Sequence, residues 1–290
     1  MQKVNRLHYL LMLFLIIVLA SCQKENQQQT LQNEETLSVS EKVILPEMEN
    51  SSALVSRESD RDYETFHGPT VQMGNGHVRS WINISEEDDK PLAIGIEFTA
   101  NSFQGLTDDP LNFAASTFFL KLHQKAKAIT PFEHITINWE PKGHEPAHIY
   151  DVPHFDMHFY KITIPEQLAI TGVPTTLPPP GYLPTSYVIQ GATVPQMGTH
   201  WLDPSSPELP PTFAPFTHTL IYGSNNGHVI FIEPMITRAF LLSGASYSKS
   251  YPQPIHFSPS GKYYPTKYKI WKNAENGKSY VALTDFVWRN

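Results

Sequence analysis

Short runs of β-branched and aromatic residues recur between residues 65 and 290, and they constrain the fold more than any other feature of the sequence. Branched and aromatic side chains favour strands because they pack well on a pleated surface. We predict a strand in each of eight such runs: 78–84, 92–99, 134–139, 155–164, 216–222, 229–233, 263–271 and 280–288. The chain is therefore predicted to be all-β.

Glycine and asparagine residues between these runs indicate tight turns. Gly74-Asn75-Gly76, Asn225-Asn226-Gly227 and Asn276-Gly277 supply residues that readily adopt the positive φ angles of hairpin turns. Prolines gather at 174–184 and 204–215, which predicts long surface loops, since proline cannot donate a hydrogen bond inside a central strand. Hairpin-joined strands predict an antiparallel β-sandwich or a jelly-roll-like barrel with long Pro-rich loops.

Helical periodicity is scarce, and we expect at most one or two short helices. The best helical segment is 112–128, although its apolar positions fit neither the helical nor the strand period cleanly. About 226 residues, from 65 to 290, are enough to bury one sizeable core. We therefore predict a single β-rich domain over 65–290.

The N-terminus has the pattern of an export signal that ends at a cysteine. Lys3 and Arg6 precede an apolar run over 9–20, which is too short to span a bilayer as a stable helix. The sequence Leu-Ala-Ser-Cys at 19–22 resembles the bacterial lipobox, in which the signal is removed and the cysteine is acylated. Cys22 is the only cysteine of the chain. The sequence thus predicts a signal peptide over 1–21 and a lipid membrane anchor, palmitate included, on Cys22.

Residues 22–64 have the composition of a disordered tether. Between 23 and 64 there are ten acidic and four basic residues, and no aromatic residue precedes Tyr63. Gln23-Lys24-Glu25 is similar to the surface-export signal of Bacteroidetes lipoproteins, although Asn26 stands where that signal usually has a second acidic residue. We expect a cell-envelope lipoprotein on the outer membrane, facing the cell surface or the periplasm. The domain itself has no basic stripe, which excludes nucleic acid as a partner.

Histidines are the residues most suggestive of chemistry. Twelve of the thirteen lie in the domain, and five of them fall within 25 residues: His134, His144, His148, His154 and His158. In an extended strand, residues two apart share a face at about 6.7 Å, whereas residues four apart are separated by about 13 Å. To share an ion, His154 and His158 therefore need Asp156 between them or a bend at Pro153.

We predict a metal site formed by His154, His158, His200 and Glu233. His200 is expected in a loop after residues 197–199, and Glu233 at the end of a strand before Pro234. Imidazole and carboxylate ligands suit divalent ions, with zinc favoured and iron, manganese, nickel or copper as alternatives. A buried hydrogen-bond network without a metal is the alternative to the whole site.

Two carboxylates are candidates for catalysis at such a site. With an open coordination position on the metal, Glu145 or Asp156 would act as general base toward a bound water, giving hydrolase or lyase chemistry. The common signatures of other enzymes are missing, including a Gly-x-Ser-x-Gly elbow, a phosphate-binding glycine loop and a His-Glu-x-x-His motif. The sequence leaves open whether the protein is an enzyme.

Four blocks of sequence resemble the TTHB-type domain-of-unknown-function family of exported bacterial proteins. They are Gly-His-Glu-Pro at 143–146, Tyr-Asp-Val-Pro-His-Phe-Asp-Met-His-Phe-Tyr at 150–160, Met-Gly-Thr-His-Trp at 197–201 and Phe-Ile-Glu-Pro-Met-Ile-Thr at 231–237. The resemblance covers residues 67–242. It implies a compact β-rich domain, a His/Glu cluster and homo-oligomerisation, and it names no activity.

Two further function classes stay open. Trp81, Trp139, Trp201 and Trp271, together with the Pro-rich loops, suit a binding module for an extracellular small molecule or glycan, because aromatic faces stack on sugars. A structural or assembly protein that forms a homo-oligomer is the other class.

Overall fold

A computed structural model of the protein describes residues 42–46 and 62–290. The predicted signal peptide, Cys22 and most of the predicted tether lie outside these residues and stay predictions. The described residues belong to one compact unit, Val39–Asn290. Within this part of the chain, no helix has the length and apolar character needed to cross a membrane.

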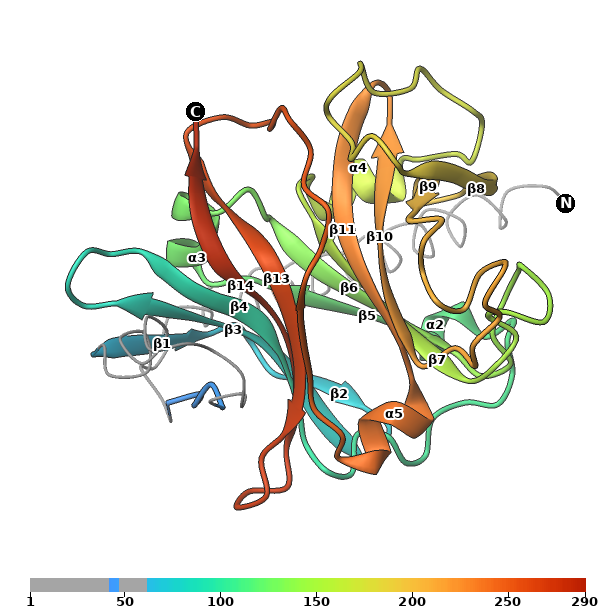
Figure 1. The fold of residues 1–290 in the computed structure, drawn as a ribbon. Coiled ribbons are helices and arrows are strands. Elements are labelled where there is room, and N and C mark those ends of the chain that lie inside the picture. The colour runs from blue at the N-terminus through green and yellow to red at the C-terminus, as the bar shows by residue number, and fades with distance from the viewer. Residues whose placement is uncertain (1–41, 47–61) are drawn as a thin grey trace, which may run out of the picture. The chain divides into compact units, whose positions relative to one another are not determined.

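Two antiparallel sheets of seven strands each form an open β-sandwich, which confirms the all-β prediction and excludes the closed-barrel alternative (Figure 1). Sheet A has the order β1 (Tyr63–His67), β3 (Gly76–Ser85), β4 (Pro91–Phe98), β14 (Ser279–Arg289), β13 (Lys262–Lys272) and β12 (Tyr247–Ser250), with β2 (Val71–Met73) paired to β3. Sheet B has the order β5 (Thr117–Lys121), β6 (His134–Glu140), β7 (His154–Tyr160), β11 (His228–Thr237), β10 (His218–Asn225), β9 (Gly198–Leu202) and β8 (Val188–Val194).

The main core lies between the two sheets and is built from alternate residues of their strands. On β4, Ile94, Ile96 and Phe98 are fully buried, and the same cluster contains Phe155 and its alternating neighbours on β7. The rings of Phe98 and Phe155 lie 6.4 Å apart across the sandwich. Burial of each such side chain contributes about 1.5–3 kcal/mol. This core therefore fixes which face of β7 points inward.

All eight predicted strands are present, and six further strands were not predicted. The additional strands are β1, β2, β5, β8, β9 and β12. The predicted strand 155–164 is too long, because β7 ends at Tyr160 and α4 (Ile164–Leu168) follows. A capping box between Thr163 and Glu166 starts this helix by satisfying free backbone N–H groups of its first turn. Local capping therefore ends the strand-like run.

Within residues 62–290, four short helices occur where one or two were expected: α2 (Phe113–Ser116), α3 (Gln124–Ile129), α4 and α5 (Arg238–Ser243). The predicted helix over 112–128 is wrong in its middle, where β5 pairs with β6. Its residues, Thr-Phe-Phe-Leu-Lys, are mainly branched or aromatic and suit a strand. A helix, a strand and a second helix in succession explain why neither period fitted the segment.

The hairpin between β10 and β11 has the turn that its sequence predicts. Asn225 pairs with His228, and the two residues between them, Asn226 and Gly227, have φ angles of 48° and 79°. Positive φ at both central positions matches the right-handed twist of the flanking strands. The turn, together with the irregularity that shifts the register between Gly223 and Ser224, sets the pairing of Glu233 of β11 with Ile221 of β10.

Val43 belongs to the domain, although it lies in the predicted tether. Its side chain is buried against Trp81, Trp271 and Tyr280 on the outer face of sheet A. Its N–H donates to Thr65 Oγ1 at 3.1 Å. An apolar residue within an acidic segment can cover an aromatic sheet face, so the domain begins before the predicted boundary at residue 65.

Candidate metal centre

The outer face of sheet B carries the candidate site. Because Phe155, Met157 and Phe159 of β7 face the core, the alternate residues His154 and His158, with Asp156 between them, point to the opposite face. This face is also covered, and the three side chains are 0%, 3% and 0% exposed. An apolar cluster of loop and strand residues packs on the same face: Tyr150, Leu202, Leu209, Phe216, Ile221 and Met235. Buried polar groups need hydrogen-bonding or charged partners, so His154, Asp156 and His158 require such partners on this face.

Two groups of ligand-type side chains occupy this face, each with two histidines and one carboxylate. Group A consists of His144, His154 and Asp156, and group B of His158, His200 and Glu233. Within each group, one atom from every side chain lies within 4.8 Å of the others.

In group A, both imidazoles point at the carboxylate of Asp156. His154 Nε2 lies 3.1 Å from Oδ1, and His144 Nε2 lies 3.4 Å from Oδ2. His144 comes from the loop between β6 and β7, where its N–H donates to Tyr150 O. Gly143 permits this close return of the loop, because a Cβ there would lie 1.9 Å from Tyr150 O. The loop is thus held over the end of β7.

In group B, both imidazoles point at one oxygen of Glu233. His158 Nε2 lies 3.3 Å and His200 Nε2 lies 3.8 Å from Glu233 Oε2. Strands β7 and β11 lie side by side in the sheet (Figure 1). Their register pairs Ile232 with Phe159 and Met235 with Asp156, which brings Glu233 beside His158.

A single ring braces the two histidines of group B. Phe231 lies with its ring centroid 4.7 Å from that of His158 and 5.4 Å from that of His200. The ring occupies the space over Gly223 of β10, where a Cβ would lie 1.9 Å from Phe231 Cζ. Because Gly223 also pairs with His200 of β9, the missing side chain lets β9, β10 and β11 place both histidines around one phenyl ring.

The hydrogen bonds of group A define which ring nitrogens face the carboxylate. His144 Nδ1 lies 2.6 Å from Glu145 O, and His154 Nδ1 lies 2.7 Å from Val152 O. A carbonyl only accepts, so each Nδ1 carries the proton and each Nε2 of the neutral ring presents a lone pair. Lone pairs that face carboxylate oxygens require a proton or a metal cation between them. Backbone carbonyls orient metal-binding histidines in this same way.

Group A has the electrostatics of a charged pair. Burial alone would lower the pKa of His144, but the carboxylate of Asp156 raises it to about 10. Burial alone would raise the pKa of Asp156, but His154 and His144 hold it well below its usual range. Without a metal, this group is therefore an imidazolium facing a carboxylate.

Group B is neutral without a metal. Burial lowers the pKa of His158 to about 3 and that of His200 to about 4. Burial, reinforced by the charge of Asp156, raises the pKa of Glu233 well above its usual range. At neutral pH both rings thus keep free lone pairs, and the carboxyl group has to lose one proton when a cation binds.

The spacing within both groups fits a shared metal ion. Zinc binds imidazole nitrogen and carboxylate oxygen at about 2.0–2.2 Å, which places tetrahedral ligand atoms about 3.4 Å apart. The distances of 3.1 and 3.4 Å in group A, and of 3.3 and 3.8 Å in group B, bracket this value. Five buried atoms of the groups have no hydrogen-bond partner among the described residues: His154 Nε2, Asp156 Oδ1, His158 Nδ1, His158 Nε2 and Glu233 Oε2.

The four predicted ligands divide between the groups. The structure brings His158, His200 and Glu233 together and places His154 in group A. His200 lies on β9 rather than in a loop, and Glu233 lies inside β11, which continues to Thr237. His154 and His158 are four positions apart on a straight strand, which separates them by about 13 Å. This distance is too long for both to bind one ion, so they belong to different groups.

The structure also gives positions to four acidic or basic side chains outside the predicted ligand set. His144 and Asp156, one of the two base candidates, belong to group A. The other candidate, Glu145, is exposed, and its carboxylate accepts from the N–H of Ala147. Glu140 pairs with His154 across β6 and β7, and burial, followed by the charge of Asp156, raises its pKa to about 7. The sequence signal for Glu140 is the alternation of polar residues along β6, which places its side chain on the same face as the other polar residues of that strand.

Comparisons of the chain with family models, with curated proteins and with solved structures gave no match. The family resemblance of its four sequence blocks therefore stays a prediction. The chain is assigned to no family, and its functional assignment depends on the geometry of groups A and B.

Proposed function

We propose that this domain binds divalent transition-metal ions, with zinc favoured, at groups A and B. The observation that carries the proposal is the convergence of two imidazole Nε2 atoms on one buried carboxylate in each group. Two histidines and one carboxylate are the ligand set of several zinc enzymes and of non-haem iron sites. Three protein ligands also leave a coordination position for water or substrate.

A metal-free network is the competing explanation. In it, the imidazolium of His144 pairs with Asp156, while a protonated Glu233 donates to a histidine of group B. Such a network satisfies the buried groups without any ion. The two explanations differ in one measurable quantity, the metal content of the purified protein.

Hydrolase or lyase chemistry is proposed at group A, because this group reaches the surface. The side chain of His144 is 37% exposed, whereas those of His158 and Glu233 in group B are 0% and 2% exposed. A bound metal would supply a Lewis acid that lowers the pKa of a coordinated water toward neutrality. Glu140, which pairs with His154 across β6 and β7, is then the proposed proton acceptor in place of Glu145 and Asp156, since it lies beside a ligand of this group without belonging to it.

Metal analysis tests the proposal directly. Protein saturated with zinc and then desalted is expected to retain about two ions per chain. Glu233→Gln should remove the ion of group B and Asp156→Asn the ion of group A, because each loses its only carboxylate ligand. His77→Ala, which changes an exposed histidine on β3, is the matched control and should retain both ions.

The same preparations test the catalytic role. Zinc-loaded protein is expected to hydrolyse an activated ester such as p-nitrophenyl acetate, and Glu140→Gln should slow this reaction by about 100-fold, as for other general bases, while keeping its zinc. A wild-type protein that retains no zinc would contradict the metal site. Full zinc retention with no rate difference between Glu140→Gln and wild type would contradict the catalytic role alone.

The aromatic residues that favoured a glycan-binding module are mostly buried. Trp81, Trp139 and Trp271 are only 1–3% exposed, and Trp201 is half-buried with its Nε1–H donated to Ser224. Stacking on a sugar requires an exposed ring face. The burial of these side chains therefore favours a structural role in the hydrophobic clusters over a role in ligand recognition.

A further inference from the structure

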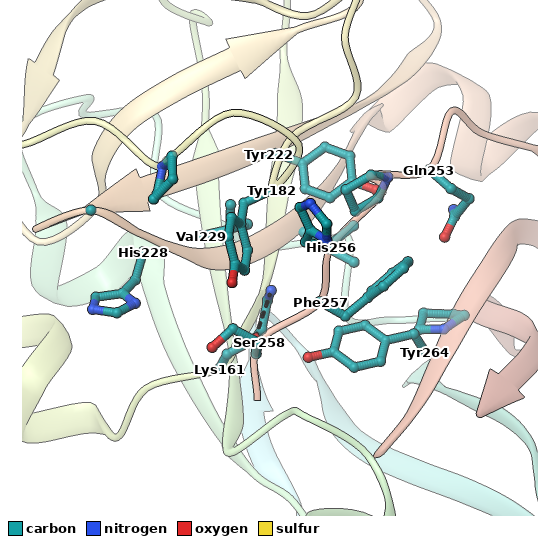
Figure 2. A pocket seen from close by; sticks show the side chains of 15 residues that line it. Lys161, Tyr182, Tyr222, His228, Val229, Gln253, His256, Phe257, Ser258 and Tyr264 are labelled. Carbon is teal, nitrogen blue, oxygen red and sulfur yellow. Dashed lines mark hydrogen bonds between the residues drawn. The ribbon is translucent and has the colours of Figure 1, made fainter. Parts of the chain in front are cut away.

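A cavity of about 130 Å³ lies at one end of the sandwich and shares no lining residue with groups A and B (Figure 2). Its floor comes from strands of both sheets, including Tyr222 of β10, Ile232 of β11 and Tyr264 of β13. Its walls come from two Pro-rich loops, around Pro179 and Pro254. A cavity on the order of 150 Å³ is large enough to bind benzene, so this one has room for a small organic molecule.

The walls of the cavity are joined to each other by backbone hydrogen bonds. The carbonyl of Gly181 accepts from the N–H groups of both Ile255 and His256, at 2.9 and 2.8 Å. Gly181 has a φ of 88°, and a Cβ there would lie 2.7 Å from the His256 ring. The hydroxyl of Tyr264 donates to Pro259 O at 2.7 Å. The two loops are thus held in place before any ligand binds.

Lys161 brings a cationic group into this cavity without a counter-ion. Among the lining residues it is the only lysine, arginine, aspartate or glutamate. Its Nζ donates to Ser258 O at 3.5 Å and lies 5.5 Å from the centroid of the Tyr264 ring (Figure 2). Lys161 forms no ion pair with another of the described residues. Burial lowers the pKa of Lys161 to about 7. Lys161 is half-buried. A partly buried ammonium without an anion carries a desolvation cost, and an anionic ligand would offset it.

The rest of the lining is aromatic or apolar. Tyr182, Phe257 and Tyr264 surround the lysine, and Val229 and Ile232 complete the apolar surface. The other titratable side chains of the cavity are His228, His256 and the tyrosines, so no acidic group competes for the ammonium. A ligand for this cavity therefore needs one negative charge and an apolar body.

We propose that this cavity is a binding site for a small organic carboxylate, whose carboxylate group binds Lys161 Nζ and whose apolar body packs against Tyr182, Phe257 and Tyr264. A charge-assisted hydrogen bond from the ammonium supplies specificity for the anion. The aromatic walls select a planar or short aliphatic body over a hydrated inorganic anion. The site is independent of metal binding, because neither group contributes a lining residue.

Calorimetric titration of the full chain with benzoate and with benzamide tests this proposal. The two probes have nearly the same shape and differ in charge. Benzoate is expected to bind at least about tenfold more tightly, since hydrogen bonds to charged groups contribute about 1.5–3 kcal/mol. At pH 8, benzoate binding should also take up protons, because a bound anion raises the pKa of Lys161 and the amine becomes protonated.

Substitutions locate the site. Lys161→Met should weaken benzoate binding by about tenfold or more, while Lys249→Met, which changes an exposed lysine on β12, should leave it unchanged. Equal affinity of the wild-type protein for benzoate and benzamide, or no binding of benzoate at all, would overturn the proposal.

Discussion

Asp156 and Glu233 lie on neighbouring strands of one sheet face, yet they differ in charge in the metal-free protein. Asp156 has two imidazoles directed at its two oxygens, and these rings hold its pKa well below its usual range. Glu233 faces two rings whose own pKa values are lowered by burial, so neither ring supplies a positive charge and the carboxyl group stays protonated. The charge of each carboxylate therefore follows from its histidine partners.

This difference predicts unequal effects of two amide substitutions on the stability of the metal-free protein. Glu233→Gln should change the free energy of unfolding by less than about 1 kcal/mol, because a neutral amide replaces a neutral acid of the same shape. Asp156→Asn should lower it by about 2–4 kcal/mol, since a buried ion pair loses its anion while His144 is partly solvated. Urea unfolding in the presence of a chelator measures both values. Equal losses in the two variants would show that the carboxyl groups carry the same charge.

At the scale of the elements, side-chain alternation along β7 divides its residues between the hydrophobic core and groups A and B. Its odd-numbered residues fill the core, and its even-numbered residues supply three members of the two groups. The partners come from β9, β11 and the loop before β7, so the site depends on how closely these segments approach. Gly223 controls that approach in group B, because its hydrogen faces the ring of Phe231.

Gly223→Ala is expected to damage group B without changing any ligand. The added methyl group would overlap the ring of Phe231, which would have to leave its contact with His158 and His200. Such overpacking costs about 1–3 kcal/mol, and zinc affinity at group B should fall with it. Thermal unfolding and zinc titration measure the two effects. Adding Phe231→Leu to Gly223→Ala should restore part of the stability and part of the zinc affinity. If Gly223→Ala alone keeps wild-type zinc affinity, the ring of Phe231 does not brace the two histidines.

At the scale of the whole molecule, both faces of sheet B are covered around β7: one faces the core, and the other carries groups A and B. The side chains of His154, Asp156, His158 and Glu233 are therefore buried, although titratable groups are normally solvated by water. Two of the rings, His158 and His200, are neutral for this reason. The stability of the domain is thereby linked to pH through proton binding in the unfolded state.

His158 and His200 are expected to make the metal-free domain less stable as the pH falls below about 6.5, whereas Glu233 and Glu140, whose pKa values are raised in the folded domain, contribute in the opposite direction. In the unfolded chain a histidine binds a proton below a pKa of about 6.5, whereas His158 and His200 in the folded domain do so only below about 3 and about 4. Below pH 6.5 the unfolded state therefore binds more protons, and each of the two residues lowers the free energy of unfolding by about 1.4 kcal/mol per pH unit.

Urea unfolding at pH 7, 6 and 5 measures this dependence. His200→Gln should remove one titrating group and reduce the slope, and His77→Gln, at an exposed position, should not. The remaining carboxylates contribute equally in all three proteins. The linkage would be disproved by an unchanged slope in His200→Gln.

Local sequence determined the strands, the hairpin turns and the face to which each residue of β7 points. Period-two alternation and turn chemistry act over a few residues, so they can be recognised without knowing the fold. The same spacing rule indicated that His154 and His158 could not easily share one ion from a straight strand. The acylation of Cys22 and the outer-membrane address also come from the sequence and stay predictions.

Only the tertiary structure decided which carboxylate each histidine faces and which side chains are buried without a partner. His200 and Glu233 lie 42 and 75 residues after His158 in the sequence. They reach it through the pairings of β7 with β11, β11 with β10 and β10 with β9, and no local pattern encodes that register. The cavity around Lys161 likewise forms only where both sheets and two proline-rich loops meet. Ligand geometry and pKa values depend on distance and burial, and the packing of distant segments sets both.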